Sequence, residues 1–248
     1  MIERSTTNVR GHTRQTTNEC IFSIIVPVLN EADQINPLIE HIHNQGFGPL
    51  YEVIVVDGDP QGGTVRIIQD KDVIAITTEK GRGRQMNAGA AVARGEILIF
   101  LHADTKLPDG ALEKISRALE DRDYVGGAFD LRIDSDRLFL KYIAIRASLR
   151  SRLNRIPYGD QAIFLRKKYF DLIGRFKEIP LMEDVDLIRR IKKDGKQIYI
   201  LPDKVITSAR RWESEGALYT TVRNQILVGL FYLGVSPHRL AKYYRRHS

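Results

Sequence analysis

The sequence predicts an α/β fold with a doubly wound, mostly parallel central sheet and helices on both faces. Four apolar runs in the first half of the chain, at residues 22–28, 51–56, 73–77 and 96–101, are rich in Val and Ile and short enough to be strands. Helix-forming or turn-forming segments separate them, as crossover connections between parallel strands require. The runs end in polar residues, so functional groups are expected at one edge of the sheet.

The first two units follow the same pattern of strand, loop and helix. After residues 22–28, apolar side chains at Ile35, Leu38, Ile39 and Ile42 have helical spacing. The second run leads into a glycine-rich turn, after which Thr64 is expected to cap a short helix that reaches Ile68. The first half therefore contains a repeated βα pattern.

The third and fourth strands lie on either side of an alanine-rich helix over residues 85–93. The second half is less regular, and we expect the following elements there. They are a long strand at 124–133, a basic helix at 137–152, a strand at 161–165, a helix at 183–193, a short strand pair at 197–205 and helices at 217–233 and 237–244.

Composition restricts the classes of function. With 248 residues, 43% hydrophobic and 28% charged, the chain fits one large globular domain. The net charge of +7 suits an anionic partner such as a nucleotide, a phosphorylated lipid or a membrane surface. No nucleic-acid-binding module is present, so nucleic acid is not an expected partner.

Cysteine content and hydropathy indicate a cytoplasmic protein. Cys20 is the only cysteine, which fits a reducing compartment. Residues 1–20 lack the apolar core of a secretory signal, and we interpret them as a flexible arm. The apolar run at 226–235 has about ten residues, about half of what a spanning helix needs.

The fourth strand ends in His102 and, two residues on, Asp104. Their side chains are expected to point the same way, and imidazole and carboxylate both coordinate divalent cations. The alternative is that Asp104 is an N-cap before a helix that starts near Pro108.

Two more carboxylates follow strand ends, at Glu31 and Asp57. Asp57 can accept hydrogen bonds from a base or a ribose, or it can stabilise an Asx turn with Gly58. Carboxylates at three successive parallel strand ends, with Asp104 as the third, favour a binding site over three separate turns.

Residues 80–84, Lys-Gly-Arg-Gly-Arg, join the third strand to its helix. Backbone amides, a helix N-terminus and three cations there can bind a diphosphate, although a tight turn with solvated charges remains the alternative. The segment is not a dinucleotide fingerprint, because Met86 occupies the place of the third glycine.

Glu183 and Asp184 begin the helix at 183–193. Acidic residues in a first turn stabilise a helix through its dipole, which is one explanation of both. The other is that one carboxylate acts as a general base towards an incoming hydroxyl.

Five segments in this order resemble the family 2 glycosyltransferases of GT-A fold. They are Ile24–Glu31, Val55–Gly58, Gly81–Arg84 with Asn87 and Gly89, Phe100–Asp104, and Met182–Asp186. The correspondence covers about residues 22–212. Leu101–Thr105, Gly159–Gln161 and Arg211–Trp212 are most similar to a small bacterial branch of selenium- or radical-SAM-associated glycosyltransferases.

The resemblance implies a GT-A domain over residues 21–212, with a nucleotide-binding half at about 21–105 and a partly antiparallel acceptor half at about 106–212. Residues 213–248 would be C-terminal helices of the same domain. The resemblance also implies a nucleotide-sugar donor, a divalent cation (Mn²⁺ or Mg²⁺) and an inverting displacement.

The resemblance implies a role for each matching residue. Asp184 would be the general base with Glu183 in support, and Asp104 would hold the metal, with His102 as a further candidate ligand. Nucleotide contacts would come from Pro27, Asn30, Glu31, Asp57, Gly81, Arg82, Gly83, Arg84, Asn87, His102 and Ala103. Gly159, Asp160, Gln161, Arg211 and Trp212 would lie near the acceptor or the diphosphate.

Two positions depart from the family pattern. His102 replaces the first Asp of the D-x-D motif, and an imidazole favours Mn²⁺ over Mg²⁺. In another interpretation His102 packs against the nucleotide without touching metal. Asp59–Gly63 replaces the usual Ser-x-Asp, which leaves the donor undetermined, with a UDP-sugar as the leading expectation.

Two other functions remain open at this level: a sugar-phosphate nucleotidyltransferase and a non-catalytic nucleotide-binding protein. The acceptor is either lipid-linked or a small molecule. One interpretation of the basic helix at 137–152, the apolar run at 226–235 and the tail Lys242–Arg246 is a peripheral contact with the inner face of the membrane. Alternatively, these segments are core and solvated surface, or a homodimer contact.

Overall fold

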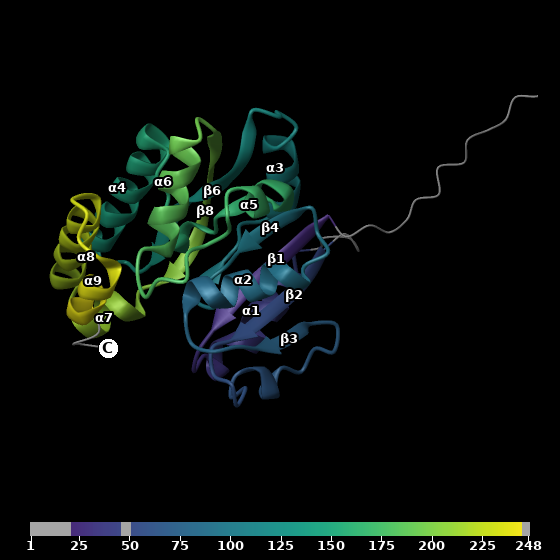
Figure 1. The fold of residues 1–248 in the computed structure, drawn as a ribbon. Coiled ribbons are helices and arrows are strands. Elements are labelled where there is room, and N and C mark those ends of the chain that lie inside the picture. Colours follow the sequence, from purple (N-terminus) through teal and green to yellow (C-terminus); the bar gives the residue numbers. More distant parts are fainter. Residues whose placement is uncertain (1–20, 46–50, 245–248) are drawn as a thin grey trace, which may run out of the picture.

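The structure, a computed structural model, describes residues 21–45 and 51–244. The expected arm at 1–20 and the last residues of the basic tail lie outside this part of the chain. One eight-stranded sheet runs through the molecule (Figure 1) in the order β3-β2-β1-β4-β7-β6-β8-β5. The strands are β1 Phe22–Val28, β2 Tyr51–Asp57, β3 Ile74–Thr77, β4 Ile97–Phe100, β5 Thr105–Lys106, β6 Tyr124–Asp134, β7 Phe164–Arg166 and β8 Gln197–Ser208.

The predicted doubly wound, mostly parallel sheet is confirmed. β1 pairs in parallel with β2 and β4, and β2 with β3, so the strand order reverses between β1 and β4. Ligands of open α/β sheets bind at such a switch point, outside the carboxyl ends of the strands. The far half is mixed, because β7 runs antiparallel to β4 and β6 while β6 and β8 are parallel.

Helices cover both faces of the sheet (Figure 1). On one face α1, α3 and α4 pack on the even-numbered side chains of β1, such as Ile24 and Val26. On the other face α2, α5 and α6 pack around Ile25 and Ile54. The bounds are α1 Ala32–His43, α2 Arg82–Val92, α3 Ala111–Ala118, α4 Leu138–Asn154, α5 Lys167–Leu172 and α6 Glu183–Lys193.

Three further helices, α7 Arg210–Glu215, α8 Ala217–Tyr232 and α9 Pro237–Tyr244, gather at one end of the sheet. A third apolar cluster joins α8 and α9 to the start of α6, with Met182, Val185, Leu227, Phe231 and Leu240 at its centre. Within the described residues, no helix combines the length and the hydropathy that crossing a bilayer requires.

The expected strand pair at 197–205 is wrong, because β8 is a single strand of 12 residues. Its register against β6 shifts between Leu201 and Lys204, so that Pro202 and Asp203 form a bulge. Proline lacks the amide that a ladder needs, and a bulge accommodates it without ending the strand.

The sequence also left elements unassigned between residues 102 and 123. Thr105 and Lys106 form β5 on β8, and α3 starts at Ala111 after Gly110, whose φ is 66°. The N-cap alternative for Asp104 is therefore wrong. The turn expected to be capped by Thr64 is a 3-10 helix, Val65–Ile67, and the Thr64 side chain makes no capping hydrogen bond.

Candidate active site

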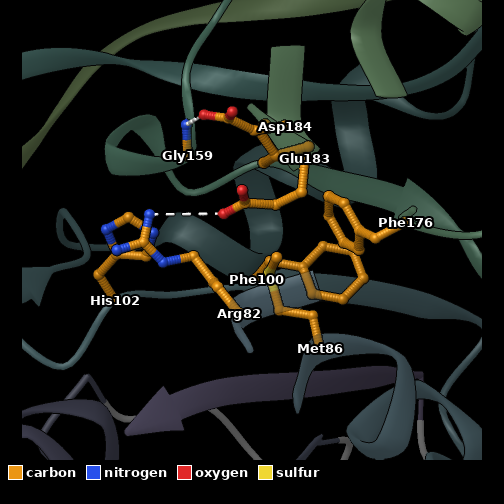
Figure 2. A pocket seen from close by; sticks show the side chains of 9 residues that line it. Arg82, Met86, Phe100, His102, Gly159, Phe176, Glu183 and Asp184 are labelled. Atoms are coloured by element: carbon orange, nitrogen blue, oxygen red, sulfur yellow. Dashed lines mark hydrogen bonds and ion pairs between the residues drawn. The ribbon is translucent and has the colours of Figure 1, made fainter. Parts of the chain in front are cut away.

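A pocket lies where the carboxyl end of β4 meets the N-termini of α2 and α6 (Figure 2). Four polar side chains reach it from these elements, those of His102, Arg82, Glu183 and Asp184, and one loop contributes the backbone of Gly159. Met86, Phe100, Ile163 and Phe176 form its apolar side. The sheet topology thus brings together motifs that are about 80 residues apart in the chain, as expected for strand-end residues.

Asp184 is held at the pocket by a loop on the opposite side. Its Oδ2 accepts a hydrogen bond of 2.6 Å from the Gly159 amide (Figure 2), and its Oδ1 accepts one of 2.7 Å from the Val185 amide. Amide donors stabilise a carboxylate and fix its direction. Asp184 is half-buried, so a carboxylate of defined orientation is accessible at the pocket.

Glu183 points to the other side of the pocket and pairs with Arg82 at 3.5 Å between Oε1 and Nη1 (Figure 2). Glu183 is only 4% exposed. Burial raises the pKa of its carboxyl, while Arg82 opposes that shift and Asp184 adds to it. Glu183 therefore orients Arg82 from a buried position, and Asp184 is the more accessible carboxylate of the two.

His102 is uncharged in this site. Burial, with the nearby cations Arg82 and Arg211, holds the pKa of its imidazole well below the usual value. A neutral imidazole keeps a lone pair that can accept a hydrogen bond or coordinate a metal. Gly159 lies against it, since a Cβ on that glycine would be 3.1 Å from Nε2.

Asp160 supplies a further carboxyl group beside the pocket. Burial raises its pKa to about 6, Asp184 and Asp104 add to the shift, and Arg150 opposes it. Its Oδ1 is buried and has no hydrogen-bond partner among the described residues. The carboxyl group is thus partly protonated near neutral pH.

Asp104 is half-buried at the end of β4, close enough for its charge to act on Arg82, Arg210 and Asp160. Thr105 Oγ1 donates to its Oδ1 at 3.3 Å. Within the described residues, no three His, Cys, Asp or Glu side chains gather as a complete metal cage. A carboxylate and a neutral imidazole are nevertheless suitable donors for a divalent cation such as Mn²⁺ or Mg²⁺, and metal binding by Asp104 and His102 stays a prediction.

The Gly-Arg-Gly-Arg segment presents only one arginine to the pocket. Arg82 faces it, whereas Arg84 pairs with Glu178 at 2.9 Å and with Glu79 on the surface. Gly81 has a φ of 155° and precedes α2, and Gly83 lies so close to the Lys177 carbonyl that a Cβ would be 2.5 Å from it. The two glycines of the segment thus serve backbone geometry, as the turn interpretation expected. Arg82 is the arginine of the segment that reaches the pocket.

Asn87 joins α2 to the segment that follows α5. Its Nδ2 donates to the Phe176 carbonyl at 2.9 Å, and its Oδ1 accepts from the Phe176 amide at 3.1 Å. Asn87 therefore positions an apolar wall of the pocket, and a direct contact with the nucleotide stays a prediction.

The Asx-turn alternative for Asp57 is present in the structure. The buried carboxylate accepts from the Asp59 amide at 3.0 Å, from Thr64 at 2.7 Å and from Val65 at 3.2 Å. It holds the loop after β2 in place. A nucleoside contact by Asp57 stays a prediction.

The other residues expected to contact the nucleotide lie in or just after β1, except for Ala103, which follows β4. Pro27 is half-buried in that strand, and Asn30 turns the chain with a φ of 58°. Glu31 pairs with Arg210 at 3.0 Å, which brings the start of α1 to the start of α7. Ala103 lies between His102 and Asp104 and is 8% exposed.

Gln161 is a structural residue of the loop that carries Gly159. It is fully buried, its Nε2 donates to the Phe129 carbonyl at 2.7 Å, and its Oε1 accepts from Ser151 at 2.8 Å and from the Tyr158 amide at 3.2 Å. Arg150 stacks on the Tyr158 ring at 3.6 Å. These contacts anchor the loop to α4 and β6.

The sequence analysis named Arg211 and Trp212 but missed Tyr244, a neighbour of Arg211, and the stack of Arg150 on Tyr158. Arg211 donates to the Tyr244 hydroxyl, and Tyr244 also lies near Arg82. Trp212 packs at the margin of the main core. No local motif marks Tyr244 or the Arg150–Tyr158 stack, because both depend on how α4 and α9 dock.

Comparisons with known proteins identify the family of the chain. A model of glycosyl transferase family 2 matches residues 23–178, more than half of the chain. The chain belongs to this family.

Among relatives, a dolichol-phosphate mannosyltransferase of Pyrococcus furiosus is 30% identical over 104 residues, which are 40% of this chain and 30% of that protein. A PGL/p-HBAD biosynthesis glycosyltransferase of Mycobacterium bovis is 29% identical over 180 residues, 63% of each chain. These matches span less than two thirds of either relative.

Solved structures share the fold. S. aureus TarS 1-349 in complex with UDP superposes with a TM-score of 0.62 at 19% identity, over 76% of this chain and 60% of that one. The same protein in complex with UDP-GlcNAc gives 0.60 at 20% identity, over 76% and 58%. The family 2 chain thus has the GT-A type of fold, as the resemblance implied.

Proposed function

We propose that this protein is an inverting glycosyltransferase that moves a sugar from a nucleotide-sugar donor to an acceptor hydroxyl. The observation that carries the proposal is the placement of Asp184. Its half-buried carboxylate, fixed by the Gly159 amide, faces a pocket at the carboxyl ends of the parallel strands. A base in this position can take a proton from a hydroxyl that enters the pocket.

The reaction would be a single displacement. The acceptor oxygen attacks the anomeric carbon while the bond from that carbon to the diphosphate breaks, and its electron pair leaves with the nucleoside diphosphate. The acceptor proton passes to a carboxylate oxygen of Asp184. Attack from the face opposite the leaving group inverts the anomeric configuration.

The leaving diphosphate gains negative charge, and cations in the site would stabilise it. Arg82, oriented by Glu183, lines the pocket, and Arg211 is close enough to lower the pKa of His102. Asp104, with His102, would hold a divalent cation that neutralises charge on the departing phosphates. A neutral His102 adds no repulsion towards that cation.

A UDP-sugar is the leading donor. The support is the fold shared with TarS, whose structures contain UDP and UDP-GlcNAc. The acceptor is either a lipid-linked or a small hydroxyl compound. The Gly-Arg-Gly segment follows β3 rather than the first strand, which gives no support to a nucleotidyltransferase.

A thermal-shift screen of nucleoside diphosphates and nucleotide sugars, with and without Mn²⁺, tests the donor and the metal together. A ligand that binds the folded state raises the melting temperature with its saturation. We expect UDP with Mn²⁺ to give the largest shift and the matching UDP-sugar to be turned over. Absence of a shift with every nucleotide would contradict the proposal, and binding without hydrolysis or transfer across a broad panel would favour a non-catalytic nucleotide-binding protein.

A further inference from the structure

Helix α4 has an exposed apolar stripe along its whole length. Leu138, Tyr142, Ile145, Leu149 and Leu153 are 82%, 53%, 62%, 53% and 72% exposed. Their spacing of three and four residues places all five on one face of the helix. We call these five residues the α4 stripe.

The opposite face of α4 is buried against the sheet. Leu140, Ala144, Ser148 and Ser151 are buried against the sheet, and Ser148 hydrogen-bonds the backbone of Leu131 in β6. The helix is therefore covered on one side and apolar on the other. Single exposed apolar side chains are ordinary, but a continuous row of five marks an interaction surface.

Cations lie on both sides of the α4 stripe. On a helical projection, Lys141 and Arg152 follow one side and Arg146 and Arg150 the other, and residues 138–154 contain no Asp or Glu. Lys141 pairs with Asp136, Arg152 with Asp130, and Arg146 donates to the Tyr142 hydroxyl. The side chains of Arg152 and Lys141 stay about half exposed despite these pairs.

A second exposed apolar row lies on α8, which contacts α4 at the same end of the sheet (Figure 1). Leu218, Val222 and Ile226, four residues apart on one face of α8, are 66%, 47% and 56% exposed, and Leu233, directly after the helix, is 83% exposed. Residues 217–232 contain no acidic side chain. Two neighbouring helices thus combine exposed apolar rows with an absence of negative charge.

We propose that the α4 stripe, extended by α8, docks this protein on the surface of an anionic lipid bilayer. A helix with an apolar face flanked by Lys and Arg inserts that face at the boundary between headgroups and acyl chains, and the cations attract anionic lipids. The overall charge of +7 acts in the same direction.

Charge favours a bilayer over a second copy of the chain. A two-fold contact between two α4 stripes would place each row of Lys and Arg near the same cations of the partner. An anionic lipid surface removes that repulsion. A fluid bilayer also does not have to match the shape of the helix surface, as a second protein copy would.

The docked face adjoins the pocket. α4 ends at Asn154, five residues before Gly159, and Arg150 joins the helix to the site loop through Tyr158 and Gln161. In a docked molecule the loop that holds Asp184 would lie near the bilayer. If the proposed transfer holds, a lipid-linked acceptor is then the class of substrate best placed to reach the site.

Vesicle cosedimentation of the full chain tests the docking without any assay of transfer, so its failure would leave the proposed function untouched. Vesicles of phosphatidylcholine, with and without phosphatidylglycerol, are compared at low and high salt. The stripe variant combines Ile145→Gln with Leu149→Gln, two exposed positions. Its matched control combines Val92→Gln with Leu172→Gln, exposed apolar residues at the ends of α2 and α5.

We expect the wild type and the control to bind vesicles that contain phosphatidylglycerol, with weaker binding at high salt. The stripe variant should bind at least about tenfold more weakly, since buried apolar area supplies much of interfacial affinity. Lys141→Glu with Arg146→Glu should abolish the preference for phosphatidylglycerol, whereas Lys71→Glu with Lys168→Glu, on other surfaces, should keep it.

Equal binding of the stripe variant and the wild type, or no binding of the wild type, would overturn the proposal. So would a wild type that is dimeric by light scattering, binds no lipid and becomes monomeric in the stripe variant, because the face would then be a contact between two copies. Circular dichroism of each variant verifies that it is folded.

Discussion

The Gly159 amide donates a hydrogen bond of 2.6 Å to Oδ2 of Asp184, which fixes the loop after α4 to the first turn of α6. These residues are 25 positions apart, and both line the pocket. The orientation of Asp184, the proposed base, therefore depends on the Gly159 amide in a neighbouring loop. Substitution of the acceptor, Asp184, and substitution of the donor residue, Gly159, should therefore affect transfer in different ways.

Asp184→Asn should retain donor binding and lose transfer. An asparagine can still accept the Gly159 hydrogen bond through its amide oxygen, so the loop should keep its place, but it cannot take a proton. General-base catalysis contributes about 10²–10⁴-fold, and kcat should fall by that factor. Kinetics with the donor found by thermal shift measure it, with the exposed Asp123→Asn as a control. Unchanged turnover would remove Asp184 as the base.

Gly159→Ala should impair transfer with little change in stability. The new Cβ would lie 3.1 Å from His102 Nε2 and 3.3 Å from Asp184 Oδ2, so both side chains must shift by a few tenths of an ångström. A small misplacement of a reacting group costs up to about 10²-fold in rate. Gly229→Ala, in α8 with nothing within 4 Å, is the matched control and should keep full activity. Equal activity of the two variants would contradict the tight geometry assigned to the site.

The strand-end residues could be predicted from sequence because the pattern of short buried strands defines one edge of a parallel sheet. Glu31 and Asp104 follow β1 and β4, and Asp57 is the last residue of β2. The role of each of these side chains could not be predicted from the sequence. Asp57 can serve a nucleoside or its own loop, and only the positions of the Thr64 and Val65 amides show that it holds the loop.

The supporting contacts could not be predicted, because they join residues far apart in the chain. Gln85 donates to the Val28 and Val56 carbonyls, 57 and 29 residues away. A buried glutamine in an alanine-rich helix gives no local sign of these partners. The same holds for Tyr244, which reaches Arg211 from the last described helix.

Gln161→Leu should destabilise the fold by on the order of 3 kcal/mol, because it leaves the buried groups that bond to Gln161 without partners. They include the Phe129 carbonyl and the Tyr158 amide, whereas the Ser151 hydroxyl can still donate to the Ala147 carbonyl. Urea denaturation measures the change, and Gln34→Leu on the exposed side of α1 should cost less than about 0.5 kcal/mol. A Gln161 variant as stable as the wild type would show that the loop is anchored by other contacts.

Asp104→Asn should remove the dependence of nucleotide binding on metal. A neutral amide is a poorer ligand than a carboxylate for a hard cation, so Mn²⁺ should no longer increase the UDP-induced thermal shift, while the shift without metal remains. Asp109→Asn, exposed in the same segment, is the control. A metal-dependent shift that survives in Asp104→Asn would place the cation elsewhere.

Asp160→Asn should stabilise the protein at neutral pH but not in acid. Burial raises the pKa of the folded carboxyl from 3.8 to about 6, so between these values the unfolded chain loses the proton while the folded chain keeps it. Stability contributed by this group therefore falls as pH rises from about 4 to 6. Each pKa unit corresponds to about 1.4 kcal/mol, which sets a gain of about 1–3 kcal/mol for the variant at pH 7.5, shrinking towards zero near pH 4. Urea denaturation at both pH values measures it, and Asp160→Ala separates loss of charge from loss of shape. A gain of the same size at both pH values would show that ionisation of Asp160 is not its cause.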